Sequence, residues 1–253
     1  MNGNSAHLRL IQDRAHDGAF NMAVDEFFLR RQIQMQDRNP ILRVYRFSEP
    51  TMTVGYGLWR TLLGGTNGGM PTIRRMTGGG AVLHNESDLT YSLIVSLSEQ
   101  KPLRKVKESY FFIHEALRKT LNYFGIRAEL FGKNDNFPLH LSSPSAKAQT
   151  GKEEREGLFC FDSPVLHDVM LSGEKVAGAG QKRTLGYLLH QGSIAWGVLM
   201  GVNPSLSEAR FSEQFSVCLS RLLDLPVKEM SFDAEELRGT LTPSLNGYAG
   251  TNS

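Results

Sequence analysis

Three consecutive glycines, Gly78-Gly79-Gly80, constrain this chain more than any other feature of its sequence. Glycine residues let a backbone adopt positive φ and approach another group without a Cβ in the way. The run follows Arg74-Arg75 and leads into Ala81-Val82-Leu83-His84, whose alternation predicts a strand. A phosphate loop would end in Gly-Lys-Ser/Thr, and a dinucleotide fingerprint would space its glycines along a helix start. We therefore predict a turn between strands, in a narrow slot where backbone lies along a ligand.

Two further motifs follow in order along the chain. The first is Cys160-Phe161-Asp162-Ser163-Pro164, followed by Ser172-Gly173-Glu174-Lys175-Val176-Ala177-Gly178-Ala179-Gly180-Gln181; the second is Leu189-His190-Gln191-Gly192-Ser193. Together with the glycine turn they resemble the catalytic domain of the biotin/lipoate protein ligase superfamily, over roughly Leu8 to Leu223. Cys-Phe-Asp-Ser-Pro ahead of Gly-Glu-Lys is most similar to the cysteine-dependent octanoyltransferases of lipoate biosynthesis.

Composition excludes several classes of protein. The net charge of +2 gives no electrostatic case for nucleic-acid binding, although Lys101, Arg104, Lys105 and Lys107 form a modest basic cluster. No apolar run approaches membrane-spanning length, and the N-terminus lacks the plan of a secretion signal. The two cysteines are expected to be free thiols. We expect a cytoplasmic protein.

The hydrophobic pattern predicts an α+β fold. Strands form hairpin-like runs with helices inserted between them, which favours a mixed, largely antiparallel sheet with flanking helices on one side. The resemblance implies the same architecture, like that of class II synthetases and biotin ligases. Predicted helices cover Phe20–Arg38, Val106–Phe124 and Leu206–Leu223; predicted strands cover Ile41–Phe47, Thr51–Tyr56, Leu89–Leu97, Ile126–Leu130 and Tyr187–Trp196, with a hairpin of Val165–Leu171 and Lys175–Ala177.

We predict one catalytic domain over residues 1–238. The residues that follow, 239–253, are rich in Gly, Ser, Thr and Asn and are expected to form a disordered tail. Residues 62–70 and 133–156 are expected to be loops, the second one mobile and closing over an acyl slot.

Cys160 and Lys175 are the candidate catalytic pair. A thiolate can attack an acyl carbonyl and form a thioester that an amine later discharges. A nearby ammonium favours the thiolate and can polarise the carbonyl. Spacing alone favours the ordinary alternatives, a buried inert Cys160 and a solvated Lys175 in a turn. The resemblance implies instead that Cys160 carries the acyl group and that Lys175 contacts the acyl carbonyl or, in ligases, the acyl-adenylate.

Several other residues are candidates for substrate binding. The small residues after Lys175 would leave room for an acyl chain, although a tight strand crossing predicts the same residues. Arg75 could bind a carrier phosphopantetheine, a nucleotide phosphate or a surface carboxylate. His84 and His190 are expected to line the pocket or to support it through hydrogen bonds. The full set is Arg75, Gly78, Gly79, Gly80, His84, Ala177, Gly178, Ala179, His190 and Gly192; no spacing typical of a metal site is present.

Three functions are compatible with these residues. The first is transfer of octanoyl from octanoyl-acyl carrier protein, through Cys160 and without a cofactor, to a lysine of a lipoyl domain in the glycine cleavage H protein or a 2-oxoacid dehydrogenase E2. The second is a lipoate–protein ligase that uses ATP and Mg²⁺ to form lipoyl-AMP. The third is an amidotransferase between lipoyl domains, or a noncatalytic binder. We predict the first.

Overall fold

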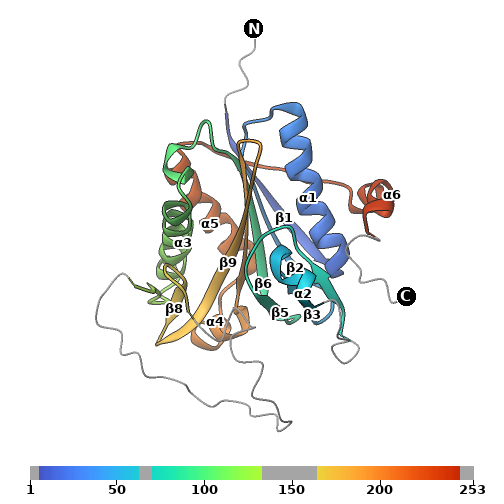
Figure 1. The fold of residues 1–253 in the computed structure, drawn as a ribbon. Coiled ribbons are helices and arrows are strands. Elements are labelled where there is room, and N and C mark those ends of the chain that lie inside the picture. The colour runs from blue at the N-terminus through green and yellow to red at the C-terminus, as the bar shows by residue number, and fades with distance from the viewer. Residues whose placement is uncertain (1–5, 63–69, 133–163, 246–253) are drawn as a thin grey trace.

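The computed structural model describes residues 6–62, 70–132 and 164–245 of the chain. Its centre is an eight-stranded sheet (Figure 1). In order across this sheet, the strands are β11 (Val227–Glu229), β1 (Leu8–His16), β2 (Ile41–Phe47), β6 (Leu89–Ser96), β10 (Tyr187–Ile194), β9 (Glu174–Thr184), β8 (Val169–Leu171) and β7 (Glu129–Leu130). Strand β1 pairs in parallel with β11 and β2, and the other pairs are antiparallel. The predicted mixed, largely antiparallel sheet is confirmed.

Two tight turns connect the strands nearest the glycine-rich β9. Ser172 and Gly173 have φ values of 51° and 87°, and Leu185 and Gly186 have 46° and 80°. Positive φ at both central residues is the type I′ geometry, which matches the twist of a two-residue hairpin. The predicted hairpin is therefore present, but β9 continues to Thr184 rather than ending at Ala177. Glycine is a weak strand former, and the part of β9 from Ala177 to Thr184 is stabilised by pairing with β10, a non-local effect.

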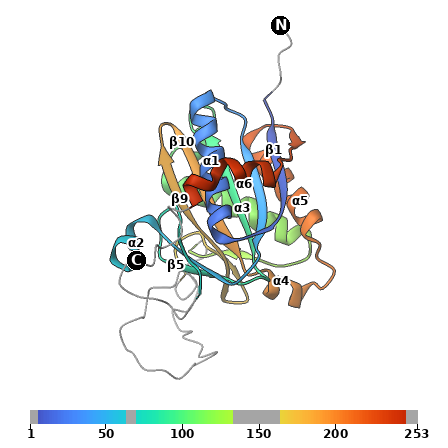
Figure 2. The same cartoon turned by 90° about the vertical axis from the view of Figure 1, so that its right-hand side faces the viewer.

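Helices cover both faces of the sheet, so the expectation of helices on one side was wrong. Helices α3 (Val106–Tyr123) and α5 (Glu208–Leu223) pack on one face (Figure 1). Helix α1 (Gly18–Met35) packs on the other face, with α6 (Ala234–Leu245) against it (Figure 2). Every residue of β6 and of β10 is buried. Because successive residues of a strand face opposite sides, these two strands supply both hydrophobic layers.

A second, three-stranded sheet carries the glycine turn. Its order is β4 (Thr72–Arg74), β3 (Thr51–Val54) and β5 (Ala81–His84), and α2 (Tyr56–Leu62) follows β3. Residues 75–80 connect β4 to β5, so the predicted turn between strands is correct. The small sheet lies beside the lower half of β6 in Figure 1.

Several elements were not predicted from the sequence; they include β1, β4, β11, α2, α4 (Trp196–Val202) and α6. The buried residues of β1 are Leu8, Leu10, Ile11 and His16, without the regular alternation by which half-buried strands are recognised. Helices α2 and α4 have seven residues each, too short for a clear helical period. A 3-10 turn, Lys101–Leu103, precedes α3.

The predicted boundary at Gly239 lies inside helix α6. Asp233 accepts hydrogen bonds from the backbone N–H groups of Glu235 and Glu236, which caps this helix. Leu237 and Leu241, one helical turn apart, are buried in the hydrophobic layer of α1. This packing extends order to Leu245. Within the described ranges, no helix has the length and apolar character needed to cross a bilayer.

Candidate functional site

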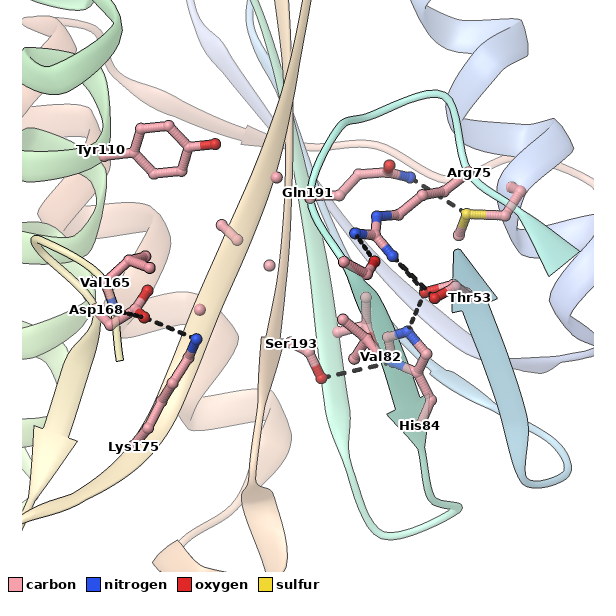
Figure 3. A pocket seen from close by; sticks show the side chains of 18 of the residues that line it. Thr53, Arg75, Val82, His84, Tyr110, Val165, Asp168, Lys175, Gln191 and Ser193 are labelled. Atoms are coloured by element: carbon pink, nitrogen blue, oxygen red, sulfur yellow. Dashed lines mark hydrogen bonds and ion pairs between the residues drawn. The ribbon is translucent and has the colours of Figure 1, made fainter. Parts of the chain in front are cut away.

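A cavity of about 470 Å³ lies between the two sheets. Figure 3 shows its two walls. Tyr110, Asp168 and Lys175 form one wall, and the glycine turn with Val82 and His84 forms the other. The floor is the face of the large sheet that carries Ser193. Val165 and Leu166, at one side, are 61% and 47% exposed, so we take this side as the mouth.

Lys175 is held at the mouth by Asp168. Its Nζ lies 2.7 Å from Asp168 Oδ2, and the two side chains are only 6% and 3% exposed. Asp168 Oδ2 also accepts a hydrogen bond from the Val165 backbone N–H at 2.8 Å. A Cβ built on Gly178 would lie 2.6 Å from Lys175 Cε and 2.9 Å from Nζ. The ammonium therefore lies directly over the Gly178 backbone, where any larger residue would displace it.

The glycine turn contacts protein backbone on two sides. A Cβ on Gly55 would lie 2.0 Å from Gly79 O, and one on Gly180 would lie 2.6 Å from Gly78 O. Gly79 has a φ of 97°, a region that L side chains rarely adopt. Gly79 and Gly80 line the cavity, whereas Gly78 lies against β9 and donates to Gln181 O. The sequence predicted that the backbone of the glycine turn lies close to a ligand. In the structure this backbone also lies close to the backbone of neighbouring segments.

Arg75 shapes the same turn. Its guanidinium donates to Thr53 O, to Thr53 Oγ1, to Gly78 O and to Gly80 O, at 2.7–3.2 Å. The side chain is 6% exposed and lines the cavity. These four bonds to protein oxygens hold the turn against β3.

His84 lines the cavity as a neutral ring. Its Nε2 lies 2.8 Å from Thr53 Oγ1, and its Nδ1 lies 3.5 Å from Ser193 Oγ. Thr53 Oγ1 also accepts from Arg75 at 3.2 Å, and its hydroxyl proton is available to Nε2 of the neutral ring. Burial, with the nearby Arg75 charge, lowers the pKa of His84 to about 3. Its observed hydrogen bonds go to side chains.

His84 should make stability depend on pH. The unfolded histidine has its ordinary pKa of 6.5, so between pH 6.5 and 3 the unfolded chain binds a proton that the folded chain does not. The contribution of the neutral His84 ring to the free energy of unfolding is therefore fully present above pH 6.5. It is lost progressively as the pH falls from 6.5 toward 3. Between pH 7.5 and 5.5 we expect the wild type to lose about 1.4 kcal/mol more than His84→Gln. Urea unfolding at both pH values checks this; equal losses in the two proteins would contradict it.

Three of the predicted site residues do not line the cavity. Gly78 and Ala177 do not line the cavity, and Ala177 is buried in the hydrophobic layer of α3 and α5. His190 lies behind the cavity wall, with Nε2 3.1 Å from Tyr91 Oη and Nδ1 2.9 Å from Gln181 Nε2. Burial, with the neighbouring His114, lowers the pKa of His190 well below its ordinary value. Cys160 lies outside the described residues.

The remaining predicted residues come together at the cavity. These are Arg75, Gly79, Gly80, His84, Lys175, Gly178, Ala179 and Gly192. Sequence reasoning missed Asp168, Thr53, Tyr110, Thr90 and Gln191. Asp168 could have been predicted from the pairing of the β8–β9 hairpin. Met170 pairs with Lys175, so Asp168, two residues before Met170, lies diagonally across from the lysine. Among the described residues, no group of three or more His, Cys, Asp or Glu side chains is placed to hold a metal ion.

A buried polar network supports the glycine turn from below. Arg43 is fully buried and bonds to Asp13 at 2.7 Å and to Asp25 at 3.0 Å. Asp25 accepts from Gln191 Nε2 at 2.7 Å, and Gln191 Oε1 accepts from Thr77 Oγ1 at 2.8 Å. The position of Thr77, which precedes the three glycines, is thereby tied to the core.

The fold is that of the lipoate–protein ligases. Protein Ta0514 from T. acidophilum, solved with bound lipoic acid, superposes with a TM-score of 0.63 and 20% identity over 95% of both chains. A lipoate-protein ligase A bound with ATP gives 0.60 and 20% over 94% of both chains. Residues 17–215 match the lipoyl protein ligase A/B catalytic domain, and the chain belongs to this family.

Curated relatives carry a more specific description. Octanoyltransferase LipM of Oceanobacillus iheyensis is 31% identical over 188 residues, which is 73% of this chain and 62% of the relative. Octanoyltransferase LipM of Kyrpidia tusciae is 34% identical over 190 residues, 74% of this chain and 65% of the relative. The chain thus spans somewhat less than two thirds of the length of these relatives.

Proposed function

We propose that this protein is an octanoyltransferase of protein lipoylation. It takes an octanoyl group from octanoyl-acyl carrier protein and passes it, through a thioester on Cys160, to a lysine of a lipoyl domain. The observation that carries the proposal is the Lys175 ammonium, fixed over Gly178 at the mouth of a cavity that runs into the buried sheet face. The octanoyltransferase relatives support the same reading.

The reaction consists of two acyl transfers. In the first, the Cys160 thiolate attacks the carbonyl of the octanoyl thioester; a new C–S bond forms, and the carrier thiolate leaves and takes up a proton. In the second, the neutral amine of the acceptor lysine attacks the octanoyl-cysteine; an amide forms, the amine proton is lost, and the cysteine thiol is regenerated. Lys175 stabilises the negative charge that develops on the carbonyl oxygen in both steps.

The acceptors are the lipoyl domains of the glycine cleavage H protein and of 2-oxoacid dehydrogenase E2 subunits. Conversion of a thioester into an amide is downhill, so this transfer needs no nucleotide. The reaction is cytoplasmic in this proposal, as are its donor and acceptors. A structural relative from Thermoplasma acidophilum is described as a bipartite lipoate protein ligase with its E2 lipoyl domain.

An intact-mass experiment tests the proposal. The full-length protein is incubated with octanoyl-acyl carrier protein in the absence of ATP. We expect a hydroxylamine-sensitive octanoyl adduct that is lost in Cys160→Ala and retained in Cys218→Ala, a matched control because Cys218 lies in α5, away from the cavity. Addition of a lipoyl domain should then discharge the adduct.

The other two functions give different results in the same experiment. Pyrophosphate release that requires lipoate and ATP, and that is unaffected by Cys160→Ala, would identify a ligase. Formation of the adduct only from octanoyl-H protein, and not from the acyl carrier protein, would identify an amidotransferase.

A further inference from the structure

A tight turn before β8 carries Asp168, the residue that binds Lys175 at the mouth of the cavity (Figure 3). In this turn, residues 165–168, the Asp168 N–H donates to Val165 O at 2.9 Å and the Val165 N–H donates to Asp168 Oδ2 at 2.8 Å. The third residue, His167, has a φ of 75°. Positive φ at that position alone is the type II geometry, in which glycine or asparagine is usual. A histidine keeps this conformation only where surrounding contacts enforce it.

Hydrogen bonds to two neighbouring segments supply those contacts. The His167 N–H donates to Phe131 O at 3.0 Å, and the Phe131 N–H donates to Asp168 O at 2.8 Å, next to β7. The His167 carbonyl is instead bonded to α3, where His114 Nδ1 lies 2.6 Å from the oxygen. The peptide group between His167 and Asp168 is therefore held at both ends, at its N–H by Val165 and at its C=O by His114.

His114 makes this bond as a neutral ring. The side chain is fully buried, and burial lowers the pKa of His114 below its ordinary value. A neutral imidazole carries one proton and a carbonyl oxygen only accepts, so the proton is on Nδ1. The other nitrogen, Nε2, is buried and has no hydrogen-bond partner among the described residues. An apolar side chain of similar size would avoid that unfavourable nitrogen, but it could not bond to the His167 carbonyl.

Asp168 connects this hydrogen bond to the cavity. Its side chain is 3% exposed and is attached one peptide group away from the carbonyl that His114 holds. Lys175 Nζ lies 2.7 Å from Asp168 Oδ2, and the ammonium lies over Gly178. His114 does not itself line the cavity. It can therefore act on a bound carbonyl only through the residues that it holds.

We infer that His114 is a positioning residue: its Nδ1–H fixes the peptide group before Asp168, and Asp168 fixes the Lys175 ammonium where the acyl carbonyl is polarised. The inference rests on the proposed function for the role of the ammonium. The contacts from His114 to Lys175 are tested separately below.

Single-turnover octanoyl transfer gives the first test. His114→Leu, which lacks the donor, should slow acylation about tenfold, because displacement of a catalytic group by about 1 Å or less has effects of this order. His114→Asn can place its amide nitrogen where Nδ1 lies, so its rate should stay within about threefold of the wild type. The amide nitrogen of His114→Gln is one bond farther out, so this variant should be as slow as His114→Leu. Where the leucine variant does not fold, the comparison of asparagine with glutamine decides.

A double-mutant cycle shows whether His114 acts through Lys175. In the Lys175→Met background there is no ammonium to position, so His114→Leu should change the rate by less than about twofold. A purely structural role would give the same loss in both backgrounds. Thr120 is the matched control on α3, since it is fully buried and donates to Ala116 O within the helix. Thr120→Val should leave the rate of transfer unchanged.

Chemical labelling of Lys175 tests the contacts without octanoyl transfer. Only a neutral amine reacts with acetic anhydride, and the fixed Asp168 carboxylate keeps Lys175 charged. Limited acetylation followed by peptide mass spectrometry should show Lys175 modified about fivefold faster in His114→Leu, because its local structure opens more often. His114→Asn and Thr120→Val should react at the wild-type rate.

The inference fails on any of three results. These are a rate in His114→Asn as low as in His114→Gln, an equal loss from His114→Leu with and without Lys175, and Lys175 labelling that no substitution of His114 changes. Absence of octanoyl transfer in the wild type, with the expected labelling pattern, would instead count against the proposed function alone.

Discussion

Replacing Lys175 by methionine is expected to slow octanoyl transfer by about 100- to 1,000-fold, the usual effect of removing one fixed donor from a charge that develops on a carbonyl oxygen. The ammonium is held by Asp168 at 2.7 Å and lies over Gly178, at the mouth of the cavity. Methionine keeps an unbranched apolar stem but has no charge. Single-turnover transfer from octanoyl-acyl carrier protein, followed by intact mass, measures the effect.

A second substitution distinguishes a loss of catalysis from a loss of stability. Lys175→Met alone removes the ammonium from a carboxylate that is 3% exposed, which is destabilising. Asp168→Asn removes that buried charge, so the double variant should regain thermal stability while transfer stays slow. Transfer by the double variant within tenfold of the wild-type rate would show that Lys175 does not act on the carbonyl.

Arg43→Met is expected to have the largest effect on stability, a loss of about 3–5 kcal/mol in the free energy of unfolding. The guanidinium is fully buried between Asp13 and Asp25, and it also donates to Asn21 Oδ1 at 2.7 Å. Its removal leaves two buried carboxylates without their cation. Equilibrium unfolding in urea measures the loss.

An exposed ion pair supplies the control for this substitution. Arg14 pairs with Glu235 at 2.8 Å, and these side chains are 63% and 77% exposed. Arg14→Met should therefore change stability by about 1 kcal/mol or less. A loss of similar size in both variants would contradict the view that the Arg43 network stabilises the fold through its burial.

The sequence allowed prediction of elements whose signals are local. The amphipathic periods of α3 and α5 and the apolar run of β6 lie within single stretches of chain. The three consecutive glycines likewise predict a turn without reference to any other part of the sequence. Strand β1 has no such signal and is stabilised by β2, β11 and the layers around it. The helices on both faces follow from strands buried on both sides, which a pattern typical of hairpins does not reveal.

The candidate site was predictable where its residues stand in motifs. Lys175, Gly178 and the turn glycines were found in this way, and the structure brings them to one cavity. The buried network contains Arg43, Asp25 and Gln191, which are far apart in sequence and are joined by individual hydrogen bonds. No regular spacing in the sequence predicts such a network.

The outermost strands of the large sheet are short, which affects how readily the protein aggregates in concentrated solution. Strand β7 has two residues and β11 has three, although the strands between them reach eleven. An outer strand exposes backbone donors and acceptors that can recruit a strand of another molecule, and a very short one offers few of them. Edge-to-edge aggregation through these two strands is therefore disfavoured by the geometry of the sheet itself.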